Sequence, residues 1–235
     1  MKFLILAAGI GKRIMPLTND VPKCLLKINQ KPIIEYILES IDSSNKFDKF
    51  IVVGKKGNCW NDKNYKFLKS YPLKIIYNSK NIQRDNAYSL LLGLKKIGEE
   101  NVIIIDGDIL FKKEIFLKLL NSKYENVLLS RPIKNLEEKG GKIKAGLGGK
   151  IIKIGESISE KPPLYIYSGI AKISKELNIY LKENLNNHTK IVNAINEACK
   201  LFDIYNLSFT GDKNWININN IEEFKKATQV YEEKK

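Results

Sequence analysis

The residues best suited to chemistry lie near the start of the chain, where a short apolar run is followed by glycines and then by cations. The run Phe3–Ala8 is too short for a membrane span, so we expect a buried strand there. Gly9 and Gly11 allow the backbone to come close to a ligand and to turn its N–H groups outward, which suits a phosphate. Arg13 and Lys23 add two positive charges. Together these residues predict a site for a polyanionic ligand.

A second candidate group is Asp106-Gly107-Asp108, which directly follows the apolar run Val102–Ile105. Acidic residues at the carboxyl end of a central parallel strand lie where α/β sheets bind their ligands. A carboxylate there suits Mg²⁺, which is bound through one or two protein oxygens together with phosphate oxygens. A simple strand-ending turn, rich in Asp and Gly, is the alternative explanation.

The segment Leu6–Lys23 resembles, without a gap, the opening of the nucleotidyltransferase family, L-A-A-G-x-G-x-R-x-x-P-L-T-x-x-x-P-K. It differs from the dinucleotide fingerprint because Ile14 stands in the place of the third glycine. The resemblance implies that Arg13 contacts the α and β phosphates of a nucleotide and that Lys23 bridges the α-phosphate and the acceptor. It also implies that the nucleotide is bound by the surrounding turn, which contains Leu6, Ala7, Ala8, Gly9, Gly11 and Lys12.

The same resemblance assigns the metal. It implies that Asp108 holds Mg²⁺ and that Asp106 touches the nucleotide or a metal-bound water. The second ligand of the family comes just before the C-terminal helix, where related cytidylyltransferases carry D-x-D or E-x-D and this chain has Asn217-Ile-Asn219. Asn219 occupies the position of the usual ligand, and Asn217 remains the alternative. The missing charge is expected to weaken Mg²⁺ binding without abolishing it.

The segment Asn86–Leu90, N-A-Y-S-L, resembles the phosphocholine and inositol-phosphate cytidylyltransferases more than the G-T-A-x-A-L run of hexose-phosphate enzymes. That likeness implies that Asn86 and Ser89 contact the pyrimidine edge and that CTP is preferred over UTP or dTTP. The same two side chains could instead cap the helix that follows. Both interpretations remain open from the sequence.

The acceptor site is less clearly marked. Sugar nucleotidyltransferases carry E-K-P and a glycine about eleven residues later, whereas here Gly169 follows Glu160-Lys161-Pro162 after seven positions. Lys161 and Lys153 are candidates for the acceptor's phosphate, with an exposed lysine as the alternative, and Tyr167 is a candidate acceptor contact. A choline group would need aromatic faces or carboxylates around it. The candidates for such a role are Tyr165, Tyr167, Tyr205, Phe209, Trp215, Glu137, Glu138, Glu156 and Glu160. His188 is expected to be structural.

Strands and helices alternate in the pattern and must position these groups. Apolar runs predict strands, and helical spacing of apolar residues predicts helices between them. The predicted strands cover 2–7, 49–53, 73–77, 102–106, 126–131, 165–173, 204–209 and 215–218, with a hairpin around 148–149. The predicted helices cover 32–43, 61–70, 86–97, 112–121, 175–184, 189–202 and 221–233. This order predicts a three-layer α/β/α sandwich with a Rossmann-like, mostly parallel sheet and a smaller β-rich lobe.

We expect one nucleotidyltransferase domain over 1–235, with a nucleotide-binding half at 1–110 and an acceptor-binding half at 111–235. The hydrophobic and charged contents, 43% and 28%, are those of a globular protein, and no run is long enough for a membrane span. Three cysteines without paired spacing, and no leader-like start, suggest the cytoplasm. The net charge of +14 comes mainly from scattered lysines, which argues against nucleic-acid recognition.

These features predict a Mg²⁺-dependent cytidylyltransferase, a monomer or homodimer, that transfers CMP from CTP to a phosphorylated small molecule and releases pyrophosphate. Phosphocholine-like, phospho-polyol and phosphonate acceptors stay open, and the product would serve cell-surface polysaccharide or lipid synthesis. A uridylyl- or thymidylyltransferase acting on a sugar 1-phosphate is the main alternative. A catalytically weak nucleotide-sensing subunit is a further one, because Asn219 replaces a carboxylate.

Overall fold

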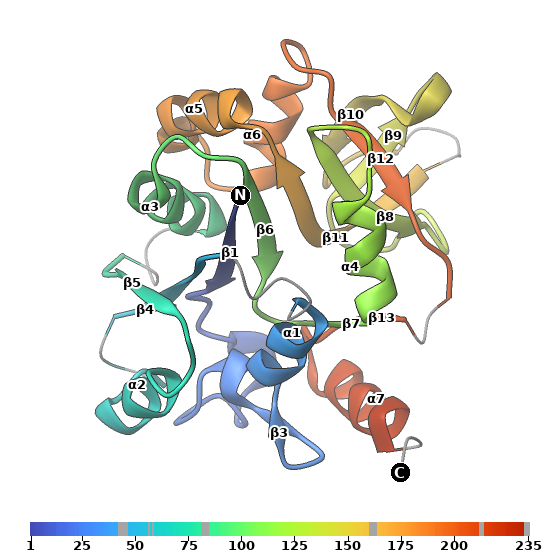
Figure 1. Ribbon diagram of the computed structural model, residues 1–235. Helices are drawn as coiled ribbons and strands as arrows, with labels where there is room; N and C mark the ends of the chain where they lie inside the picture. The colour runs from blue at the N-terminus through green and yellow to red at the C-terminus, as the bar shows by residue number, and fades with distance from the viewer. Residues whose placement is uncertain are drawn as a thin grey trace.

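The computed structural model describes residues 1–41, 47–55, 57, 59–80, 85–159, 164–211 and 214–232. Four parallel strands form the first half of its central sheet in the order β6-β1-β4-β5 (Figure 1). They are β1 (Lys2–Ala7), β4 (Lys49–Gly54), β5 (Lys74–Asn78) and β6 (Val102–Asp106). The helices between them are α1 (Ile33–Ile41), α2 (Asp62–Leu68) and α3 (Asn86–Ile97). The predicted alternation of strands and helices is therefore confirmed in this half.

The second half extends the same sheet with strands that pair antiparallel, except for β12, which pairs parallel with β8. They are β8 (Val127–Pro132), β9 (Lys142–Ala145), β10 (Ile151–Gly155), β11 (Leu164–Ile173) and β12 (Tyr205–Ser208). The long strand β11 pairs antiparallel with β6, β8 and β9, and it thereby joins the two halves. The helices are α4 (Lys113–Leu120), α5 (Lys175–Asn184), α6 (Ile191–Ala198) and α7 (Ile221–Glu232).

Two short strand pairs lie outside the large sheet. One joins β7 (Ile109–Phe111) to β13 (Trp215–Asn217), and the other joins β2 (Lys27–Ile28) to β3 (Lys31–Pro32). The pattern predicted neither β7 nor the β2–β3 pair, because each is too short to show a period. Pro32 was expected in the first turn of a helix, but it ends β3, and α1 begins at Ile33. The pairing of β7 with β13 brings the chain after Asp108 beside Asn217.

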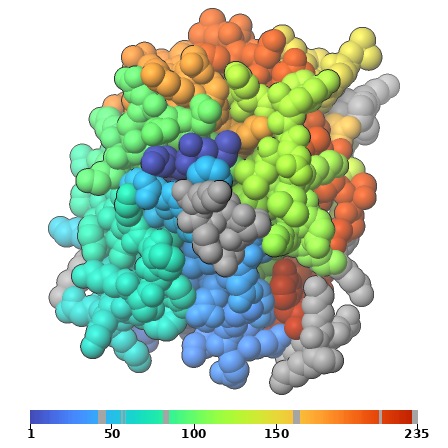
Figure 2. Space-filling view, viewed as in Figure 1, coloured from blue at the N-terminus to red at the C-terminus, as the bar shows by residue number. Residues whose placement is uncertain are grey.

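The side chains of β1 alternate between two cores, which is what a strand covered on both faces requires. Phe3 and Ile5 pack in the core that includes side chains of α1, α4 and α7, and Leu4 packs in the core that includes α3, α5 and α6. Figure 1 shows α3, α5 and α6 gathered at the upper left, and Figure 2 shows α4 on the near face. The expected three-layer α/β/α architecture is confirmed. Within the part of the chain that is described, no helix has the length and apolar character needed to cross a membrane.

Candidate active site

The glycine-rich segment forms a tight turn after β1 that depends on one glycine. Gly11 has a left-handed φ of 66°, and the hydroxyl of Thr18 donates to its carbonyl oxygen at 2.9 Å. A Cβ on Gly11 would lie 2.8 Å from Cγ2 of Thr18, so a side chain there would clash as well as strain the backbone. The turn leads into a single turn of 3₁₀ helix, Lys12–Ile14, which leaves Arg13 exposed on its surface.

This turn and the carboxyl end of β6 form one cavity of about 510 Å³. Its lining brings together residues from both halves of the chain. Among the residues assigned from the sequence, the cavity is lined by Leu6, Ala7, Ala8, Gly9, Gly11, Lys12, Arg13, Lys23, Asn86, Ser89, Asp106, Asp108, Tyr167 and Asn219. The structure thus brings together the described residues predicted for the nucleotide and the metal, while their roles remain predictions.

The charged centre of the cavity is a contact between Lys23 and Asp108. The Lys23 ammonium lies 2.8 Å from Oδ2 of Asp108, and their side chains are 14% and 28% exposed. Asp106 is half-buried near this pair, and desolvation together with the Asp108 carboxylate raises the pKa of Asp106 to about 8. Gly169 of β11 makes room for Asp106, because a Cβ there would lie 2.5 Å from Oδ2 of Asp106. The site therefore holds one carboxylate paired with a lysine and a second, half-buried carboxyl whose pKa is raised.

The donor atoms fit a magnesium ion, but the asparagine whose oxygen lacks a hydrogen-bond partner among the described residues is Asn217 and not the first candidate, Asn219. Asn217 Oδ1 is buried without a hydrogen-bond partner among the described residues, and Asn217 lines the same cavity as Asp108. The N–H of Ile218 donates to the Asp108 carbonyl at 2.9 Å, so the two segments are adjacent. Asn219 Oδ1 instead accepts a bond from Arg13 at 3.0 Å. An orphaned amide oxygen near a carboxylate suits a hard cation.

The helix cap expected near Asn86 is provided by another residue. The side chain of Asp85 accepts the N–H of Asn86 at 2.8 Å and so caps α3. Asn86 Oδ1 accepts the first N–H of α6, from Ile191, at 3.0 Å. Ser89 is buried and accepts from Asn78 at 2.9 Å. Capping of α3 by Asn86 or Ser89 is therefore wrong, because tertiary partners satisfy both side chains.

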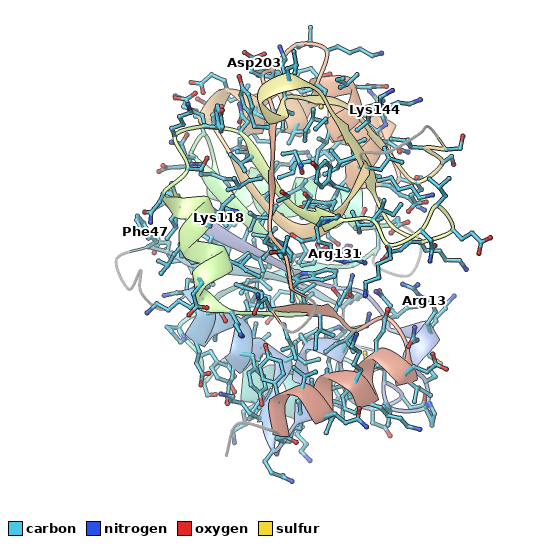
Figure 3. The ribbon with its side chains drawn as sticks, turned by 90° about the vertical axis from the view of Figure 1, so that its right-hand side faces the viewer. Arg13, Phe47, Lys118, Arg131, Lys144 and Asp203 are labelled. Atoms are coloured by element: carbon cyan, nitrogen blue, oxygen red, sulfur yellow. The ribbon has the colours of Figure 1, made fainter. Side chains whose placement is uncertain are left out.

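A second cavity of about 830 Å³ adjoins the first, on the side of the β-rich lobe. Arg131 of β8 lies 5.5 Å above the Trp215 ring and forms an ion pair with Glu138. Figure 3 shows Arg131 near the middle of the view and Arg13 lower and to the right, and both line this cavity. The indole N–H of Trp215 donates to the Ser168 carbonyl at 2.9 Å, which fixes the ring.

The aromatic and acidic candidates are only partly gathered in this cavity. Tyr167 and Trp215 line it, whereas Tyr205 stacks on Tyr124 with ring centroids 3.7 Å apart. Since Arg131 already covers the Trp215 ring, the described residues form no aromatic cage for a quaternary ammonium. The acidic candidates Glu137, Glu138 and Glu156 also line the cavity, and Glu160 lies outside the described residues.

The two lysines proposed for the acceptor's phosphate have different outcomes. Lys161 lies outside the described residues. Lys153 is exposed on β10 and lines neither cavity, which departs from its predicted role. An irregularity in the β10–β9 pairing between Ile151 and Lys153 leaves Ile152 and Lys153 both exposed, so simple alternation fails there. His188 contacts Glu197 at 3.1 Å outside both cavities, in keeping with a structural role.

Sequence reasoning did not foresee an ion pair at the junction of the cavities. Lys190, at the N-terminus of α6, pairs with Glu156, which follows β10 and was named from the sequence only as a candidate contact for a choline group. Seven of the described residues line both cavities, namely Arg13, Gly140, Glu156, Tyr167, Lys190, Asn217 and Asn219. The sequence offered no signal for Lys190, because its position depends on how α6 packs against β10.

Comparison with known proteins shows which family the chain resembles. Residues 2–234 match the family described as nucleotidyl transferase. Choline-phosphate cytidylyltransferase of Streptococcus pneumoniae is 28% identical over 231 residues, which are 87% of this chain and 98% of that protein. CTP:phosphoglutamine cytidylyltransferase of Campylobacter jejuni is 34% identical over 131 residues, 53% of this chain and 50% of that protein.

The fold itself recurs in a solved structure of UDP-glucose pyrophosphorylase complexed with UDP-glucose. Its TM-score is 0.80 at 22% identity, and the match covers 100% of this chain and 99% of that one. That likeness concerns the fold alone. Because the family match spans nearly the whole sequence and its opening motif lines the cavity, this chain belongs to the nucleotidyl transferase family.

Proposed function

We propose that this protein transfers CMP from CTP to a phosphorylated small-molecule acceptor and releases pyrophosphate. The observation that carries the proposal is the joining of two cavities at Arg13 and Asn217, with Lys23 and Asp108 in the smaller one. A nucleotide triphosphate in the smaller cavity would place its α-phosphorus at that junction. An acceptor in the larger cavity would then approach from the opposite side.

The reaction needs positioning and charge neutralisation more than acid–base chemistry. An oxygen of the acceptor's phosphate forms a bond to the α-phosphorus of CTP, the bond between the α-phosphorus and the bridging oxygen breaks, and pyrophosphate leaves. The acceptor oxygen is already anionic at neutral pH, so no general base is required. Arg13 and Lys23 would bind the phosphates and stabilise the charge that develops at phosphorus.

Asp108 and the amide of Asn217 or Asn219 would hold Mg²⁺, which when bound neutralises phosphate charge. No group of three His, Cys, Asp or Glu side chains that could hold a metal is found among the described residues. The nucleotide's own phosphates would therefore complete the coordination. In the absence of ligands, Lys23 is paired with Asp108 and must exchange that partner for phosphate.

The preference for CTP is supported by two residues in the first turn of α3 and by the relatives. Asn86 and Ser89 line the smaller cavity, as a contact with a pyrimidine requires. The relatives named for choline phosphate and phosphoglutamine are both cytidylyltransferases. The three cysteines are free thiols, which supports the cytoplasm as the proposed location.

Pyrophosphate release tests the proposal. The purified protein would be assayed with CTP, UTP and dTTP, each with Mg²⁺ and a panel of acceptors that includes phosphocholine, glycerol 3-phosphate and glucose 1-phosphate. We expect the highest kcat/KM with CTP. A clear preference for UTP or dTTP would move the protein to the hexose-phosphate branch. Absence of turnover with every nucleotide, together with tight CTP binding, would instead support a nucleotide-sensing role.

A further inference from the structure

Lys190 and Glu156 occupy the junction of the two cavities, and the reaction proposed above does not yet use them. Among the described residues, Arg13 and Lys190 are the basic side chains that line both cavities. Arg13 comes from the first half of the chain and Lys190 from the second. A phosphate that approaches from the larger cavity would therefore meet a cation on each side of the transfer point.

The backbone around Lys190 is held at both neighbouring positions. The carbonyl of Thr189 accepts the N–H of Ala87 at 3.2 Å, and the N–H of Ile191 donates to Asn86 Oδ1 at 3.0 Å. The first turn of α3 and the start of α6 are thus joined directly. Lys190 consequently has a fixed Cα, and its side chain, which is 38% exposed, can move toward the cavity.

The partner of Lys190 is positioned from the β-rich lobe. Glu156 follows β10, and β10 is tied to α6 by a bond from the Ile154 N–H to Asn196 Oδ1 at 3.0 Å. The Glu156 carboxylate forms an ion pair with the Lys190 ammonium. An ammonium has three donors, so the pair leaves donors available for a phosphate oxygen.

We propose that Lys190 receives the phosphate of the acceptor at this junction and that Glu156 holds Lys190 there until the phosphate arrives. The proposal rests on the function proposed above and assigns to Lys190 the role predicted for Lys153 or Lys161. Lys190 suits that role because it lines the larger cavity, proposed for the acceptor, and also the smaller one, proposed for the nucleotide. Glu156 lowers the affinity for phosphate because its charge repels the anion, and it keeps the lysine in place.

Inorganic phosphate is the probe, so the test does not depend on knowing the acceptor. The smaller cavity is first filled with the α,β-methylene analogue of CTP, or of whichever nucleotide binds, because that analogue cannot be cleaved at the reacting bond. Phosphate is then titrated and followed by ³¹P NMR. We expect Lys190→Ala to weaken phosphate binding at least about ten-fold, as for a lost charged hydrogen bond. Lys190→Arg should stay within about three-fold of wild type, since it keeps the charge.

Two further variants make the result specific. Glu156→Gln should tighten phosphate binding, because it removes a negative charge beside the anion while keeping the shape. Lys150→Ala is the matched control, since Lys150 forms an ion pair with Asp203 in the same lobe but lines neither cavity. It should leave phosphate binding unchanged. Circular dichroism would verify that each variant is folded.

Nucleotide affinity, measured separately, distinguishes the two proposals. If no nucleotide binds, the proposed function fails at that step. If the nucleotide binds but wild type takes up no phosphate, or Lys190→Ala binds phosphate as tightly as wild type, the role of Lys190 is overturned and the proposed function stands. With an accepted substrate, Lys190→Ala should raise the KM of the acceptor and leave the KM of the nucleotide nearly unchanged.

Discussion

The proposed nucleotide side and the proposed acceptor side of this site are built in different ways. On the nucleotide side, one turn after β1 supplies the glycines and Arg13, and the end of the neighbouring strand β6 supplies Asp106. On the acceptor side, the lining comes from β8, the segment after β10, the start of α6 and β13. The glycine-rich turn is therefore local in sequence, although the rest of its cavity comes from both halves of the chain, whereas the acceptor side is an assembly of distant segments.

On both sides, the basic side chains are already bonded to other side chains of the protein. Lys23 is paired with Asp108, Arg13 donates to Asn219, and Lys190 is paired with Glu156. A phosphate bound as proposed would compete with the side-chain oxygens that accept from Lys23 and Arg13, whereas the Lys190 ammonium keeps donors beyond its bond to Glu156. Positive charge is therefore preorganised on both sides, although a sequence motif marks only the nucleotide side.

The largest expected effect lies on the nucleotide side. Asp108→Ala should abolish turnover, because it removes the carboxylate proposed for the metal and leaves Lys23 without its partner at 2.8 Å. Initial rates measured across a Mg²⁺ titration test this, with Asp106→Ala in parallel. If Asp108→Ala remained active and Asp106→Ala did not, the assignment of the two aspartates would be reversed.

Lys23→Ala should lower kcat by about 10² to 10³ while CTP binding changes much less, because the charge matters most as negative charge develops at phosphorus. Single-turnover rates and equilibrium titration with CTP separate the two quantities. Lys27→Ala is a suitable control, since Lys27 is exposed on β2 and lines neither cavity. A kcat within a few-fold of wild type would contradict the bridging role of Lys23.

A smaller effect is expected where the two sides meet, at the two asparagines. A carboxylate in place of the orphaned amide should tighten Mg²⁺ binding, so Asn217→Asp should lower the Mg²⁺ concentration for half-maximal rate several-fold. Asn219→Asp should act less, because that side chain is engaged by Arg13. The larger response in Asn219→Asp would restore the original choice of ligand.

The smallest expected effects are on the free energy of unfolding, at the starts of α3 and α6. Asp85→Ala should lower the free energy of unfolding by about 1 kcal/mol, through loss of the α3 cap. Asn86→Ala should cost about as much, because the α6 N–H of Ile191 loses its acceptor. Urea unfolding measures both. If Asn86→Ala were as stable as wild type, its bond to α6 would contribute nothing to the packing of the two halves.

Much of the fold could be predicted because the pattern and the architecture agree. The continuous apolar run of β6 indicates a strand covered on both faces, and its alternate side chains do pack into two cores. The hairpin of β9 and β10 was predicted from its glycines, and the two strands pair antiparallel. The misses are short pieces, namely β7 and the β2–β3 pair, and the pairing of β7 with the predicted strand β13 depends on segments about a hundred residues apart.

The sequence by itself determined the glycine-rich turn after β1 and its cations. Gly11, Arg13 and Lys23 belong to one local connection, and their residue types set its conformation and its charge. It also determined the position of Asp106 and Asp108, because both lie at the carboxyl end of β6. The tertiary structure decided the partners of Asn86 and Ser89, the burial of Asn217 Oδ1 without a hydrogen-bond partner among the described residues, and the place of Lys190. Those features arise from the packing of α6, β10 and β13 against the first half, and contacts between distant segments leave no period or spacing in a single sequence.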